Sequence, residues 1–111
     1  MAHDETLAAQ IRGLTAGEPG LTERKMFGGL AFLIRGNMAV AASGQGGIMV
    51  RVDPQESDTL VEETDAHHMV MRGRPMRGWV RVAPEHLRAS RELASWIERG
   101  MTRARSLPVK R

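Results

Sequence analysis

The chain has 111 residues, of which 41% are apolar and 26% charged, a size and composition typical of one soluble globular domain. It contains no cysteine and no apolar run near the roughly eighteen residues of a membrane span, which excludes disulfides, thiolate metal sites and transmembrane helices. The net charge is +3, and eleven basic residues against three acidic ones lie from Arg72 onward. Because the first residues also lack the pattern of a signal peptide, we expect a cytoplasmic protein. We expect a single domain over residues 1–111, with a core over about 4–106 and a frayed basic tail over 107–111.

The first predicted element is a helix over residues 4–13. Asp4 is a suitable N-cap, and Leu7, Ala8, Ile11 and Leu14 recur at the spacing of one helical face. The Gly- and Pro-containing segment 15–20 ends this helix.

Three apolar runs separated by glycine-rich turns follow, over residues 25–34, 37–42 and 47–52. In the first run both the odd- and the even-numbered positions are apolar. This pattern predicts one central strand with both faces covered. Gly28 and Gly29 within it indicate a bulge or the close approach of another backbone. These runs predict an antiparallel meander.

The second predicted helix covers residues 54–64. Asp53 can cap it, Pro54 suits its first position, and Glu56 can complete a capping box. Two further strands are expected over residues 67–71 and 79–82, joined by a loop over residues 72–78.

The last predicted helix covers residues 84–105. One stripe along it is mostly apolar and comprises Leu87, Ser90, Leu93, Ala94, Ile97, Met101 and Ala104.

These elements together predict an α+β fold, a two-layer sandwich in which helices pack on one face of a five-stranded antiparallel sheet. We expect a shared core that includes Phe32, Val50, Val80, Leu93 and Ile97.

The residue patterns do not favour catalysis. Adjacent residues on a strand point to opposite faces, so His67 and His68 cannot easily share a metal ion. No pattern pairs a nucleophile with a base or suggests a carboxylate pair. We therefore predict no catalytic, cofactor or metal site, and a non-enzymatic protein.

Two surfaces are candidates for binding. The sheet face opposite the helices has both apolar and basic members, and the arginine-rich segment from residue 72 to 81 adjoins it, so the predicted interaction surface comprises Met49, Arg51, Arg74, Arg77, Trp79 and Arg81. The last helix carries a candidate basic face, which comprises Arg88, Arg91, Arg99 and Arg103. The first surface suits a protein partner or a second copy of the chain, whereas arginines around an aromatic ring also suit nucleic acid.

Several motifs resemble the N-terminal domain of the TfoX/Sxy family of competence regulators. They are Arg24-Lys25-Met26-Phe27-Gly28-Gly29-Leu30-Ala31-Phe32-Leu33, then Gly36-Asn37-Met38, Met49-Val50-Arg51-Val52, and Gly73-Arg74-Pro75-Met76-Arg77-Gly78-Trp79-Val80. The resemblance extends from about residue 4 to 108.

The resemblance implies a two-layer α/β domain and a non-enzymatic role in activating the transcription of DNA-uptake genes. It implies a protein partner such as a cyclic-AMP receptor protein. Full regulators of that family carry a second, helical domain, whereas this sequence stops at Arg111. The open alternatives are direct nucleic-acid binding through residues 72–81 and the basic helix face, or a small ligand-binding domain or enzyme.

Overall fold

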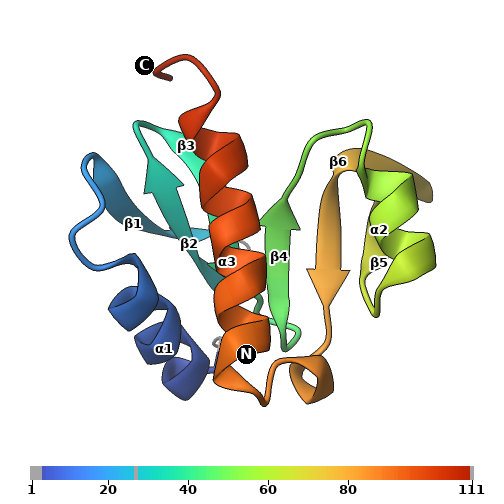
Figure 1. The fold of residues 1–111 in the computed structure, drawn as a ribbon, viewed down its shortest axis with the longest axis horizontal. Coiled ribbons are helices and arrows are strands. Elements are labelled where there is room, and N and C mark those ends of the chain that lie inside the picture. The colour runs from blue at the N-terminus through green and yellow to red at the C-terminus, as the bar shows by residue number, and fades with distance from the viewer. Residues whose placement is uncertain (1–3, 27, 111) are drawn as a thin grey trace.

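A computed structural model describes residues 4–26 and 28–110, and it shows a six-stranded antiparallel sheet with α-helices on one face (Figure 1). The strand order is β1-β2-β3-β4-β6-β5. The strands are β1 (Leu21–Met26), β2 (Gly29–Ile34), β3 (Asn37–Ala42), β4 (Ile48–Arg51), β5 (His67–Met71) and β6 (Arg74–Val82). The helices are α1 (Glu5–Thr15), α2 (Ser57–Glu63), the short 3-10 helix η1 (Pro84–His86) and α3 (Ser90–Arg105). Within the described residues, no helix is both long and apolar enough to cross a bilayer.

The predicted α+β fold is confirmed, but the single strand expected over residues 25–34 was wrong. The chain turns at Gly28, which has a φ of +77°, and β1 and β2 pair with each other so that Met26 faces Gly29. Strand β1 lies at the edge of the sheet with mostly exposed side chains, so its sequence lacks the apolar alternation that identifies a strand. The sheet therefore has six strands rather than five, and β2 alone is the strand buried throughout.

Gly29 confirms the predicted close approach of another backbone. A Cβ at this position would lie 2.3 Å from the carbonyl oxygen of Ala42 on β3. Only glycine fits such a contact, because no larger residue could start β2 here without separating the two strands.

Helix α1 confirms the predicted cap but corrects one buried position. The Asp4 carboxylate accepts hydrogen bonds from the backbone N–H groups of Thr6 and Leu7. Leu14, expected on the buried face, is 45% exposed. Thr15 is buried instead, because its hydroxyl donates to the Ile11 carbonyl and so satisfies its own polar group.

The later helices begin after the predicted positions. Asp53 caps a turn by accepting from the N–H of Gln55, but Glu56 makes no capping-box bond and α2 starts at Ser57. The continuous helix expected over residues 84–105 was also wrong. It is divided into η1 and α3, and Figure 1 shows the chain turning between them. Leu87 is buried at this break, and the extended Ala89 begins α3 without a side-chain cap.

The hairpin of β5 and β6 replaces most of the loop expected over residues 72–78. Only Arg72 and Gly73 form its turn, both with positive φ, and β6 then runs from Arg74. Pro75 and Gly78 suggest a loop by sequence, yet the structure accommodates both within a strand whose pairing shifts register between His68 and Met69.

The main core lies between the sheet and the helices, and it contains all five residues predicted to share it. Phe32, Val50, Val80, Leu93 and Ile97 are each 2% exposed or less and belong to one cluster. Leu7 of α1 and Leu60 of α2 join the same cluster, which places α1, α2 and α3 on one face.

The segment after α3 packs against the β2–β3 turn, whereas the sequence suggested a frayed tail. The side-chain amide of Asn37 donates to the Pro108 carbonyl at 2.8 Å, and the Lys110 N–H donates to the Arg35 carbonyl at 2.9 Å. A Cβ at Gly36 would lie 2.5 Å from the Lys110 carbonyl oxygen, so this turn fits the tail only with glycine.

Candidate functional site

The sheet face opposite the helices, hereafter the open face, carries the candidate interaction surface. Side chains on paired positions of neighbouring strands point to the same side. The register therefore aligns one row across the sheet, which runs Arg24, Ala31, Ala41, Met49, Arg81 and His67. The centre of the row is small and apolar, and its ends are basic.

A second apolar cluster forms the centre of the open face. Ala31, Leu33 and Ala41 are buried there, and Met26, Met38 and Met49 pack against them. This cluster is separate from the main core, because alternate residues of each strand face opposite sides. Methionine side chains cover the small alanines, which accounts for their burial without a helix above them.

Met49 and Trp79 lie on this face as predicted, but both are half-buried rather than fully exposed. Arg51 pairs with Trp79 across β4 and β6, and its guanidinium lies 4.7 Å from the centre of the Trp79 ring. Burial lowers the pKa of Arg51 below its usual value, with a smaller effect from the positive charge of Arg103. Arginine nevertheless stays protonated.

Arg81 is held at the other end of the same strand pair. Its guanidinium donates to the Gln45 side-chain oxygen at 2.7 Å and to the Ser43 hydroxyl at 3.4 Å. These neutral acceptors leave its charge uncompensated while they restrict its orientation.

The structure does not group Arg74 and Arg77 with the other predicted surface residues. Arg74 pairs with Met71 of β5, in the part of the hairpin that extends beyond the pairing with β4. Arg77 is exposed, and its guanidinium donates to the Pro54 carbonyl near α2. The four positions that come together are Met49, Arg51, Trp79 and Arg81.

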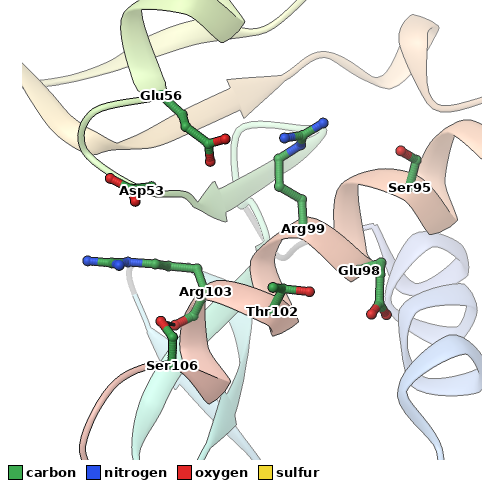
Figure 2. A pocket seen from close by; sticks show the side chains of 8 residues that line it. All are labelled: Asp53, Glu56, Ser95, Glu98, Arg99, Thr102, Arg103 and Ser106. Carbon is green, nitrogen blue, oxygen red and sulfur yellow. Dashed lines mark hydrogen bonds between the residues drawn. The ribbon is translucent and has the colours of Figure 1, made fainter.

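The predicted basic helix face lies partly inside a groove on the other side of the molecule. Figure 2 shows Arg99 and Arg103 extending from α3 toward the segment that carries Asp53 and Glu56. The groove encloses about 620 Å³ and is lined by Asp53, Glu56, Ser95, Glu98, Arg99, Thr102, Arg103 and Ser106. Its walls thus carry both signs of charge.

The remaining helix arginines do not extend this groove into a uniform basic surface. Arg91 lines an adjoining hollow that also contains Glu63 and Asp65. Arg88 lies before α3, in the break that the sequence did not reveal. The Arg99 guanidinium lies 5.6 Å from the centre of the Trp96 ring, and its buried Nε has no hydrogen-bond partner within the part of the chain that the structure describes.

The histidines are distributed as their strand positions predicted. His67 lies on the open face, whereas His68 faces the helices, where its Nε2 is 3.4 Å from Asp58. His86 lies 3.3 Å from Asp65. Among residues 4–26 and 28–110, no three His, Cys, Asp or Glu side chains are grouped as a metal site.

Sequence reasoning missed the contribution of the first sheet edge to the open face. Arg24, Met26, Leu33 and Met38 all lie on it. The missing information was the pairing of β1 with β2, since the sequence pattern predicts no element over residues 21–24.

The fold and these motifs agree with a comparison against protein families. The family model for the TfoX N-terminal domain matches residues 14–104. The chain belongs to the TfoX N-terminal domain family. No curated protein matches it. The TfoX N-terminal domain membership identifies a TfoX-like regulatory module, and its matched span includes the whole sheet and nearly all of α3.

Proposed function

We propose that this TfoX N-terminal domain is a non-enzymatic regulatory module that binds an acidic protein partner on its open face. The observation that carries the proposal is the cross-strand row with Arg24 at one end, Met49 at its centre, and Arg81 beside His67 at the other. An apolar centre with a polar rim is the usual anatomy of a protein interface.

The charge of the open face selects the kind of partner. Three arginines of its strands lie there, Arg24, Arg51 and Arg81, and none of them is paired with a carboxylate in the described part of the chain. A symmetric dimer through this face would bring like charges together, because the same patch meets itself. An acidic surface with an apolar centre complements the face better than a second copy does.

Nucleic acid is the less well supported partner. Arg99 and Arg103, the half-buried members of the basic helix face, lie opposite Asp53 and Glu56, so phosphates approaching them would also meet carboxylates. Met49 and Trp79 on the open face are best covered by another apolar surface. A phosphate backbone does not provide such a surface.

The family resemblance gives the proposal its biological setting. It suggests a cytoplasmic protein that acts in the transcriptional activation of DNA-uptake genes. A cyclic-AMP receptor protein is the first partner to test.

The test is affinity capture from native cytosol with three forms of the domain: wild type, Met49→Asp and Met71→Asp. Met71 is 43% exposed at the sheet edge, so its variant is a matched control for an added charge. We expect an acidic protein bound by wild type and by Met71→Asp but not by Met49→Asp. Retention by folded Met49→Asp would contradict the proposal.

Quantitative binding to the captured protein then tests Trp79. Trp79→Ala should weaken affinity by about 2 kcal/mol or more if the ring is an interface anchor. Sedimentation showing a dimer that Met49→Asp abolishes would assign the face to a second copy instead. Duplex DNA affinity that falls steeply with salt would favour nucleic acid.

A further inference from the structure

A small basic pocket lies at one end of the open face. It encloses about 290 Å³, just below the range of about 300–1,000 Å³ that is typical of small-molecule sites. Five strands (β1, β2, β3, β4 and β6), the β2–β3 turn and the segment after α3 contribute to it. The lining residues are Thr22, Arg24, Met26, Leu33, Gly36, Asn37, Met38, Arg51, Trp79 and Lys110.

The charges around the pocket all have one sign. Arg24, Arg51 and Lys110 are the charged side chains among the described residues that line it, and none of these described residues is acidic. Arg51 is half-buried and its guanidinium contacts the Trp79 ring, and no carboxylate of the described residues pairs with it. A desolvated arginine held in this way is strongly attractive to an anion, because the surrounding medium screens it less than water does.

The rest of the lining is apolar. Leu33 is 6% exposed and belongs to the small cluster of the open face, against which Met26 and Met38 pack. Trp79 completes this apolar wall, beside Arg51. A ligand that fits must therefore carry an apolar or aromatic body as well as a charge.

The third cation is positioned by the tail rather than by the sheet. Hydrogen bonds from Asn37 to Pro108 and from Lys110 to Arg35 hold residues 108–110 across the β2–β3 turn. Asn37 thus has its side-chain amide occupied by the tail, and Lys110 reaches the pocket from that anchored segment.

We propose that this pocket binds a small organic anion, in which a carboxylate or phosphate lies between Arg51 and the cations Arg24 and Lys110 and an apolar body contacts Leu33, Met38 and Trp79. This small-molecule site shares Arg24, Arg51 and Trp79 with the open face proposed above to bind a protein, but neither proposal requires the other.

Tryptophan fluorescence tests the site directly. Trp96→Phe leaves Trp79 as the single tryptophan, since the chain has two. In this background, benzoate and phenyl phosphate represent the two possible anionic groups on one aromatic body. Inorganic phosphate supplies the anion alone, and benzyl alcohol supplies the body alone.

We expect saturable quenching by benzoate or phenyl phosphate, with a dissociation constant on the order of 1 mM or tighter for ligands this small. The stronger of the two identifies the anionic group. Inorganic phosphate and benzyl alcohol should bind at least about tenfold more weakly, because phosphate lacks the aromatic body and benzyl alcohol lacks the anionic group.

Arg51→Met should weaken binding about tenfold or more, whereas Arg81→Gln should leave it within about twofold. Arg81 is the matched control, since it is a half-buried arginine of the same face outside the pocket. If Arg51→Met fails to fold, the exposed pair Arg24→Ala and Lys110→Ala gives the same comparison. No saturation by either aromatic anion up to about 10 mM, or equal loss in Arg81→Gln, would overturn the proposal.

Discussion

Gly100 of α3 lies directly against Ala39 of β3. A Cβ at Gly100 would lie 2.4 Å from the Ala39 carbonyl oxygen and 3.1 Å from a Val50 methyl group. The backbone of the helix therefore approaches the sheet closely at this point. The position is buried in the middle of a sixteen-residue helix, where glycine is otherwise the least favourable residue after proline.

Gly100→Ala should destabilise the fold by about 1–3 kcal/mol despite the better helix propensity of alanine, because α3 must move away from β3. Gly13→Ala is the matched control in α1, where nothing lies within 4 Å of the added Cβ. It should stabilise by about 0.5–1 kcal/mol. Urea titration measures both, and a stabilising Gly100→Ala would show that the helix is not held at this distance.

The main core gives a second prediction. Leu93→Ala and Ile97→Ala should each cost about 2–5 kcal/mol in the free energy of unfolding, since both side chains are almost fully buried. Leu14→Ala, on the exposed side of α1, should change it by less than about 0.5 kcal/mol. A loss under about 1 kcal/mol at Leu93 would mean that its face of α3 is misassigned.

An ion pair between the α1–β1 loop and the end of α3 predicts acid sensitivity. Arg105 donates to both carboxylate oxygens of Glu18, at 2.6 and 3.2 Å, and these bonds lower the pKa of Glu18 below its ordinary value of 4.5. A lowered folded-state pKa stabilises the fold above the unfolded pKa, and that contribution disappears as pH falls through the folded value.

Glu18→Gln should therefore lower stability at pH 7 by about 0.5–1 kcal/mol, as expected for a well-formed but partly solvated pair. The difference from wild type should shrink as the pH falls below 4.5. Thermal unfolding across that range measures it, with Glu62→Gln on exposed α2 as the control. A difference that stays constant with pH would assign the effect to something other than this charge.

Docking of the tail can be tested at Asn37. Asn37→Ala removes the hydrogen bond to Pro108, and it should cost about 1 kcal/mol. The amide of Lys110, which donates to Arg35, should then exchange with solvent much faster, while the amides of β3 remain protected. Fast exchange at Lys110 already in the wild type would contradict a docked tail.

Local signals were sufficient where an element is specified by its own residues. A short window of sequence contains the signals for the Asp4 cap, for the apolar runs of β2, β3 and β4, and for the apolar stripe of α3. They predicted the antiparallel sheet, the face that carries the helices and the main core.

The sequence by itself thus determined the fold class, the main core and the family motifs. Tertiary structure decided the remainder, because register and close approach depend on residues far apart in the chain. The pairing of Arg24 with Ala31 made residues 21–26 an edge strand and brought a cation to the open face. The bond from Asn37 to Pro108, seventy-one positions apart, brought Lys110 to the pocket. Helical periodicity placed Leu87 on the buried stripe but did not reveal the break between η1 and α3 at which Leu87 lies.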